Sequence, residues 1–116
     1  MSRALREAQG RRGERLAGWW LRLKGWEIVG RRVKTPRGEV DLIARDGEAL
    51  VFVEVKWRAR AADLDMAIDE YRLRRVAAAA EILAPRFLRG LEDMRIDVLL
   101  LAPGVRPRHI ANAWMP

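Results

Sequence analysis

The alternation of apolar and polar positions divides the chain into segments with different periods. Residues 3–24 predict an amphipathic helix, which Gly25 would end. The apolar residues at helical spacing are Leu16, Trp20 and Leu23. A short run at 26–33 then predicts a strand, and a turn at 35–38 closes it, because the sequence Thr-Pro-Arg-Gly is typical of turns.

The next two segments, 39–44 and 50–56, carry the clearest pattern in the chain. Both are rich in β-branched residues, which favours strands. Asp46 and Gly47 stand between them, and this dipeptide is favoured at the centre of a tight hairpin turn. The pattern therefore predicts an antiparallel hairpin.

The second half of the chain predicts another helix and further strands. The helix is expected at about 63–83, with Asp63 or Asp65 as its N-cap and Pro85 at its end. A buried strand is expected at 95–101, and 109–114 could add a short edge strand. The order α-β-β-β-α-β(-β) predicts an α/β fold, with a mixed β-sheet flanked by helices, in a single domain over residues 1–116.

Composition limits the possible classes of protein. The chain has 116 residues, no cysteine and no apolar run long enough to span a bilayer, so thiolate metal sites are excluded and no membrane partner is expected. The N-terminal residues lack the apolar core of a secretory signal, which predicts a cytoplasmic protein. The net charge of +7 points to a polyanionic partner, although a coding bias toward arginine and alanine would produce the same charge.

The hairpin brings charged residues to one side of the sheet. With Asp46 and Gly47 as the central turn residues, Asp41 opposes Phe52, and the side chains of Glu39, Asp41, Glu54 and Lys56 share one face. The opposite face collects the apolar residues Val40, Leu42, Val51, Val53 and Val55 and is predicted to be core. Asp41 then lies diagonally across from Glu54, with roughly 7–8 Å between their backbones.

Carboxylates gathered in this way repel one another, by about 4 kcal/mol for a pair at ~4 Å with an effective dielectric constant near 20. One lysine does not neutralise them all, whereas a divalent cation would, and oxygen ligands suit Mg²⁺ or Mn²⁺. Such a cation could neutralise a scissile phosphate and acidify a bound water. The alternative is an ordinary solvated strand face with Glu–Lys pairing.

Several motifs resemble those of the YraN-like family of small bacterial proteins, and the resemblance covers nearly the whole chain. The family is similar to archaeal Holliday-junction resolvases, within the PD-(D/E)XK nuclease superfamily. The matching residues are Gly13-Glu14 and Ala17, Gly38-Glu39-Val40-Asp41-Leu42-Ile43-Ala44, Phe52-Val53-Glu54-Val55-Lys56, Arg58, Arg95-Ile96-Asp97-Val98 and His109-Ile110-Ala111-Asn112-Ala113.

The resemblance implies a restriction-endonuclease-like fold and a metal-dependent nuclease site. Asp41 and Glu54 would be the ligands of Mg²⁺ or Mn²⁺, Lys56 would be the catalytic lysine, and Glu14 on the first helix would approach the same site. For Glu14 the alternative is a surface residue paired with one of the arginines around it. The family's second helix commonly carries a lysine near its first third, where this chain has Tyr71-Arg72-Leu73-Arg74-Arg75 instead.

Arg72 lies on the predicted apolar stripe of its helix, so it is interpreted as a phosphate contact that projects from the packed side; the alternative is an arginine that extends past core residues to solvent. Arg12, Arg15 and Arg58 are further candidates for nucleic-acid binding. The wider basic set also includes Arg11, Arg31, Arg32 and Arg60. Most of the five tryptophans are expected in the core, with Trp57 the best candidate for stacking on bases; His109 is expected to be structural or on the surface.

The sequence thus predicts a metal-dependent endonuclease that cleaves DNA phosphodiesters, with branched DNA suggested by the family likeness alone. Two alternatives are a non-catalytic nucleic-acid-binding module that retains the fold and a protein-interaction domain whose acidic hairpin face binds a basic partner. A homodimer would suit an enzyme that cuts two strands.

Overall fold

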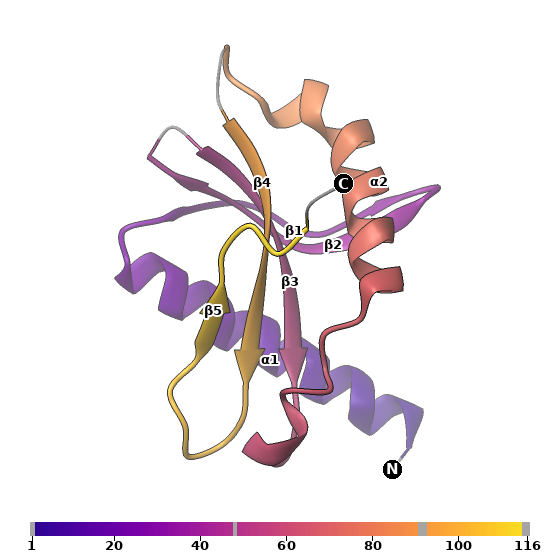
Figure 1. Cartoon of the computed structure of the whole chain (residues 1–116), viewed down its shortest axis with the longest axis vertical. Helices are drawn as coiled ribbons and strands as arrows, with labels where there is room; N and C mark the ends of the chain where they lie inside the picture. The colour runs from indigo at the N-terminus through magenta and orange to yellow at the C-terminus, as the bar shows by residue number, and fades with distance from the viewer. Residues whose placement is uncertain (1, 48, 91–92, 115–116) are drawn as a thin grey trace.

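The computed structural model describes residues 2–47, 49–90 and 93–114 (Figure 1). In chain order the elements are α1 (Arg3–Leu23), β1 (Glu27–Thr35), β2 (Gly38–Asp46), β3 (Ala49–Trp57), the 3₁₀ turn η1 (Ala61–Asp63), α2 (Glu70–Phe87), β4 (Asp93–Leu101) and β5 (Arg108–Ile110). This order confirms the prediction of a helix, three strands, a helix and two further strands.

The strands form one mixed sheet in the order β1-β2-β3-β4-β5. β1, β2 and β3 are antiparallel neighbours, β3 and β4 run parallel, and β5 returns antiparallel to β4 (Figure 1). The parallel pair requires a crossover, and α2 provides it. This is the mixed α/β arrangement of a restriction-endonuclease-like core, as predicted.

Two apolar layers enclose the sheet, one beneath each helix. Successive residues of β3 alternate between them: Leu50 and Phe52 pack with α2, and Val51 and Val53 pack with α1. The prediction of one core face and one polar face was therefore wrong, because a central strand is covered on both sides. Val40 also lies in the α2 layer and not with the other valines.

The hairpin register differs from the predicted one by two residues. Asp46 pairs with Ala49, and Leu42 pairs with Val53, so the connection begins after Asp46 and Gly47 adopts a positive φ of 59°. The turn position was wrong because both Asp46 and Gly47 favour turns and only the strand pairing decides between them. Side chains in strands alternate with a period of two, so an even shift by itself leaves Glu54 and Lys56 on a common face. At Asp41 the alternation is broken, because Val40 lies in the α2 layer and Leu42 in the α1 layer.

α2 begins later and ends later than predicted. Its N-cap is Asp69, whose Oδ1 accepts hydrogen bonds from the backbone N–H of Tyr71 and Arg72, at 2.9 and 3.4 Å. Asp63 instead ends η1 and Asp65 lies before the helix, so neither caps it. Pro85 lies inside the last turn, where the chain continues helically to Phe87 and the Leu88 N–H closes the helix on the Ala84 carbonyl at 2.8 Å.

α1 packs on the sheet through small residues. Its buried positions are Gly13, Ala17, Gly18 and Leu21. Leu16 is 51% exposed and Leu23 is 81% exposed, so two of the three residues expected to face the core lie outside it. Trp26 lies in the core just before β1, whereas Trp19 is exposed. Trp20, Trp57 and Trp114 are partly buried and pack against the core, so the expectation that most tryptophans are in the core holds fully for Trp26 alone.

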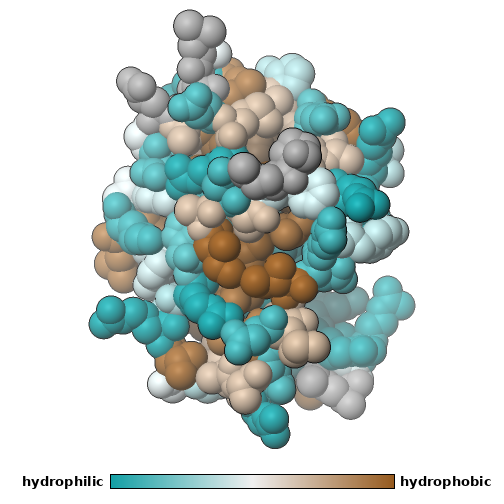
Figure 2. Space-filling model, in the orientation of Figure 1, coloured by the Kyte–Doolittle hydropathy of each residue, from teal (hydrophilic) through white to brown (hydrophobic). Residues whose placement is uncertain are grey.

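Figure 2 shows one face of the molecule, with apolar side chains gathered over its middle, between the positions of β5 and α2, and hydrophilic side chains around them. α2 packs mainly over β2, so the part of this face above β4 is covered less completely. Partly buried Ile110 and Trp114 pack against the apolar layer here. Within the described residues, neither helix has the length and apolar character that a bilayer crossing needs.

Candidate functional site

Asp41 lies where β2 and β3 begin to separate. The paired register of these strands ends at Leu42 and Val53. Beyond it, Asp41 Oδ2 accepts a hydrogen bond from the Val55 backbone N–H at 2.8 Å, so a side chain replaces the missing backbone acceptor. This hydrogen bond holds the Asp41 carboxyl group against β3, next to Glu54.

Glu54 is almost fully buried, with 2% of its surface exposed. Its Oε1 is 3.2 Å from Lys56 Nζ and accepts a hydrogen bond from Arg72 Nη2 at 3.1 Å. Its Oε2 is buried and has no hydrogen-bond partner in the described part of the chain. Both cationic groups thus approach one oxygen, and the second oxygen is left without compensation.

The surroundings of Asp41 favour its protonated form. Burial raises the pKa of Asp41 from 3.8 to about 8, and the negative charges of Glu54 and, to a smaller extent, Glu14 add to the increase. The Val55 hydrogen bond and the charge of Arg72 oppose this change without cancelling it. Asp41 and Glu54 are therefore two neighbouring carboxyl groups with too little positive charge between them.

Glu14 approaches the same region from α1. Its carboxylate accepts hydrogen bonds from Arg32 Nε at 2.6 and 3.0 Å, and this bonding raises the pKa of Arg32. Arg32 has a positive φ of 47°, in the paired stretch of β1 between Arg31 and Val33. A hollow of about 390 Å³ separates α1 from the β1–β2 edge here. Its lining includes Glu14 and Asp41 together with Arg11, Arg15, Arg31 and Arg32.

The donor set fits a hard divalent cation, with carboxylate ligands only. Glu54 Oε2 is an orphaned buried acceptor, and Asp41 belongs to a pair whose ionised form a cation would stabilise. No group of three or more Asp, Glu, His or Cys side chains converges within residues 2–47, 49–90 and 93–114. Mg²⁺ commonly uses only one or two protein carboxylates and completes its shell with water and phosphate oxygens.

The structure brings some of the predicted nucleic-acid contacts to this site and places others elsewhere. Arg72 reaches Glu54 from the packed side of α2, as predicted, while half of its side chain stays exposed. Arg15 lines the hollow with Asp41. Arg58 lines a second hollow beside Lys56 and donates to the Trp57 carbonyl at 2.8 Å. Arg12 lines a separate groove on the other side of α1.

A second buried carboxylate, Asp97 on β4, was not singled out from the sequence as a site. It is fully buried and accepts hydrogen bonds from Arg95 Nε at 3.0 Å and from the Asn112 N–H at 2.9 Å. His109 Nε2 lies 2.7 Å from Asp97 Oδ2, and His109 Nδ1 lies 3.1 Å from Lys24 Nζ. Because an ammonium group only donates, Nδ1 accepts and Nε2–H donates to Asp97. His109 is thus structural, as expected.

This second cluster joins two of the sequence motifs. Trp20 and Trp26 pack edge-on against the His109 ring, with centroids 5.7 and 5.2 Å away. Burial alone would lower the pKa of Arg95, but its bonds to Asp97 and Asp46 raise it above the usual value. The motifs around Asp97 and His109 therefore fix β5 and the following turn to β4. Only the spacing of an arginine and an aspartate two residues apart on one strand could have indicated the pairing.

Comparison with known proteins places the chain in a family. The model of the uncharacterised protein family UPF0102 matches residues 13–101. A UPF0102 protein of Sphingopyxis alaskensis is 66% identical over 116 residues, which cover 100% of both chains. Similar relatives occur in Erythrobacter litoralis, with 63% identity over 100% of both chains, and in Rhizorhabdus wittichii, with 67% identity over 97% of this chain and 95% of the relative. The chain belongs to the UPF0102 family, the YraN-like family whose motifs its sequence carries.

Proposed function

We propose that this protein is a metal-dependent endonuclease that hydrolyses DNA phosphodiesters, with Asp41 and Glu54 as the ligands of Mg²⁺ or Mn²⁺. The observation that carries the proposal is the buried, unpartnered Oε2 of Glu54 beside the carboxyl group of Asp41. Leaving a charged acceptor buried without a partner costs stability, so a site that retains one is expected to bind something there.

Each residue of the site has a separate role in the proposed reaction. A bound cation would neutralise charge on the scissile phosphate and make a water molecule more acidic. Lys56, which is mostly buried and held at Glu54, is placed to stabilise negative charge that develops on the phosphate. Arg72 keeps half of its side chain in solvent while it contacts Glu54, so it can also contact a phosphate. Arg15 and Arg11 supply further positive charge around the hollow that contains Asp41.

Glu14 has a positioning role in this proposal. Its carboxylate is taken up by Arg32, which also experiences the charges of Glu39 and Asp41. The ion pair keeps the Arg32 guanidinium group in the lining of the hollow. Because Arg32 is bound to Glu14, it does not pair with the carboxyl groups of Asp41 and Glu54. Glu14 therefore adjusts the charge around Asp41 from α1.

The test combines metal binding with cleavage. Mn²⁺ binding is measured by calorimetry on the wild type and on Asp41→Asn and Glu54→Gln, and linear, flapped and four-way DNAs are then incubated with each protein and Mn²⁺. We expect one Mn²⁺ site that both substitutions abolish, together with cleavage that is lost in both and in Lys56→Ala. Glu27→Gln is the matched control, since Glu27 is exposed on β1, away from the site, and should bind and cleave normally.

Specific outcomes would reject the proposal. Mn²⁺ binding that survives Glu54→Gln would mean that the cation sits elsewhere. Cleavage that survives both Glu54→Gln and Lys56→Ala would mean that these residues do not form the catalytic site. The folded state of each variant is checked by circular dichroism, because only a folded variant tests the site.

One observation favours a second candidate, a non-catalytic nucleic-acid-binding module. Lys56 and Arg72 already pair with Glu54, and the described residues offer no trio of acidic or histidine ligands. Such a module would bind DNA equally well in Mn²⁺ and in EDTA and would keep its affinity in Asp41→Asn. Metal-independent binding without cleavage of any DNA in the panel would favour this candidate.

A further inference from the structure

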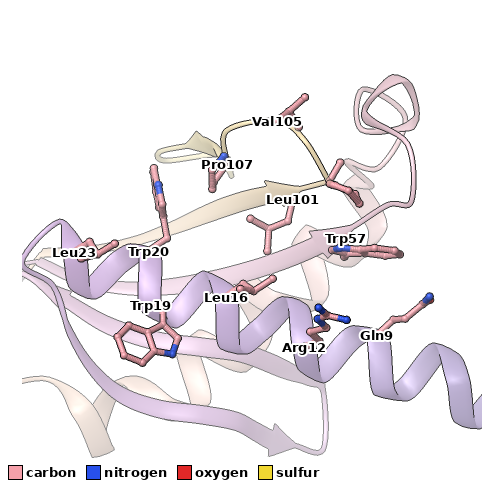
Figure 3. A pocket seen from close by; sticks show the side chains of 12 residues that line it. Gln9, Arg12, Leu16, Trp19, Trp20, Leu23, Trp57, Leu101, Val105 and Pro107 are labelled. Carbon is pink, nitrogen blue, oxygen red and sulfur yellow. The ribbon is translucent and has the colours of Figure 1, made fainter.

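An apolar groove of about 510 Å³ lies between α1 and the connection from β4 to β5. Its walls include Trp19, Trp20 and Leu23 of α1, Trp57 at the end of β3, and Val105 and Pro107 of the connection. Figure 3 shows Trp20 and Trp57 at opposite ends of the groove, with Leu16 between them and Trp19 on the outer side of the helix. Trp20 and Trp57 thus face the groove near its two ends, and Trp19 borders it from the outer side of α1.

The exposure of these side chains is unusual for a water-facing helix. Trp19 is 65% exposed and Leu23 is 81% exposed, although α1 has smaller residues on its packed face. Large apolar side chains gathered beside a groove mark a binding surface more often than an ordinary surface. The packing of α1 on the sheet does not account for Trp19, because Ala17 and Leu21 make that contact.

The positive charges around the groove favour the binding of an anionic ligand. Arg12 is the single charged residue among those of the described chain that line it. A neighbouring hollow of about 370 Å³ shares Gln9 and Trp57 with the groove, and its charged residues are Arg6, Lys56 and Arg58. No acidic side chain of the described residues lines either space. A positively charged surface therefore leads from Lys56, beside Glu54, to the tryptophans.

We propose that this groove binds the unpaired bases of a single-stranded nucleic-acid segment, whose phosphates follow Lys56, Arg58 and Arg12. Bases in a duplex are stacked on their neighbours and cannot present their faces to an indole ring, whereas unpaired bases can stack on one. The inference deepens the proposed function, on which it rests. It identifies the substrate class as DNA with a single-stranded segment next to the phosphate that is cleaved.

The test measures binding without cleavage. Fluorescence anisotropy in EDTA compares a labelled single strand, a blunt duplex of the same sequence and a duplex with a single-stranded flap. We expect the single strand and the flap to bind more tightly than the blunt duplex. Trp19→Ala should weaken binding of the single strand by roughly fivefold or more and leave the duplex unchanged, and Trp19→Phe should retain most of the affinity.

The control is Tyr71→Ala. Tyr71 is 62% exposed, close to Trp19 in this respect, but it lies on α2 across the sheet. Tyr71→Ala should change neither the affinity for the single strand nor the affinity for the duplex. Trp19 is the primary variant because truncation of so exposed a side chain leaves no buried cavity, whereas Trp57 packs against Gly13, where an added methyl group would lie 3.3 Å from Trp57 Cβ.

The outcomes separate this inference from the proposed function. Equal loss of single-strand and duplex affinity in Trp19→Ala, no loss at all, or a wild type that prefers the blunt duplex would each overturn it. Self-association that Trp19→Ala abolishes while DNA binding is unchanged would also overturn it, in favour of a second copy of the chain. Mn²⁺-dependent cleavage without a Trp19 effect refutes the groove alone, and a Trp19 effect without cleavage refutes the nuclease alone.

Discussion

At the scale of single residues, the candidate site departs from the rule that buried polar atoms are hydrogen-bonded. Glu54 Oε2 has no partner within the described chain, although Asp97, which is equally buried, has its carboxylate bonded by Arg95, His109 and the Asn112 N–H. The fold can therefore satisfy a buried carboxylate fully. That it does so at Asp97 and not at Glu54 is expected if the Glu54 site is organised for a ligand and the Asp97 site for stability.

The raised pKa of Asp41 predicts a pH-dependent stability of the metal-free protein. Between pH 4 and 8 the folded state holds the Asp41 proton, whereas the unfolded chain, with a pKa near 3.8, has released it. Stability contributed by this group is therefore complete below pH 4 and is lost as pH rises through about 8. Asp41→Asn removes the effect, so the variant should gain on the order of 2–4 kcal/mol relative to the wild type between pH 5 and 8.

Urea denaturation in EDTA at several pH values measures this difference. The amide oxygen that Asp41→Asn introduces can still accept the Val55 hydrogen bond, so the comparison isolates the charge. Asp63→Asn is the matched control, because Asp63 is half exposed and its pair with Arg60 lies on the surface. A constant difference in the free energy of unfolding between Asp41→Asn and the wild type at all pH values would contradict the prediction.

Strand alternation was sufficient to place Glu54 and Lys56 together, because it does not depend on an even error in register. The position of Asp41 depends on the end of the β2–β3 pairing and on the hydrogen bond from Val55, which the sequence pattern does not show. Asp97 was not predictable as a site. Its partners come from its own strand, from β5 and from the turn after β5, and no local pattern connects these segments before the chain has folded. Leu16 and Leu23 were expected to face the core because size and apolarity predict burial, whereas small residues determine which side of α1 packs.

At the scale of elements, both helices approach the sheet at glycine positions. A methyl group at Gly38, the first residue of β2, would lie 2.9 Å from the Arg75 carbonyl oxygen of α2. A methyl group at Gly13 of α1 would lie 3.3 Å from the Cβ of Trp57 on β3. The helices are thereby set close to the strands that carry Asp41, Glu54 and Lys56. This close approach brings Arg72 and Glu14 within reach of the site.

Gly38→Ala is expected to destabilise the protein by about 1–3 kcal/mol, because the obstructing atom belongs to a helix backbone and cannot rotate away. Gly10→Ala is the contrasting variant. Its added methyl group would meet only the end of the Arg32 side chain at 3.9 Å, so the better helix propensity of alanine should stabilise α1 by about 0.5–1 kcal/mol. Thermal denaturation measures both, and a neutral Gly38→Ala would disprove the close approach of α2.

The boundaries of α2 show where local signals stop being decisive. Asp63 and Asp65 were the predicted N-caps, and Asp69, which was not predicted, is equally suitable by residue type. The structure uses Asp69, since the preceding segment packs Leu64 and Ala67 into the core before the helix begins. The Phe87 carbonyl at the other end accepts a hydrogen bond from Arg45 of β2. Tertiary contacts therefore set both ends of this helix.

At the scale of the whole molecule, the positive charge is concentrated along α1. The hollow that contains Asp41 is lined by Arg11 and Arg15 on one side of this helix. Arg6 and Arg12 line the two spaces that adjoin Lys56 and the tryptophans. A nucleic acid that contacted all three spaces would cross α1, with its phosphates near these arginines. The net charge of +7 is therefore distributed unevenly over the surface, which composition alone could not indicate.

This distribution predicts which arginines determine the salt dependence of DNA binding. Each phosphate contact contributes about −0.9 to the slope of log affinity against log salt for a duplex, because binding releases condensed counterions. Arg15→Ala should make the slope shallower by about 0.9. Arg74→Ala removes the same charge from α2, where Arg74 is 67% exposed and lies 3.9 Å from Glu70, and should leave the slope unchanged. Anisotropy titrations distinguish the salt slopes of the two variants. They cover roughly 50 to 300 mM KCl, a range around physiological ionic strength. An equal decrease in both variants would mean that net charge, and not the arrangement along α1, attracts the nucleic acid.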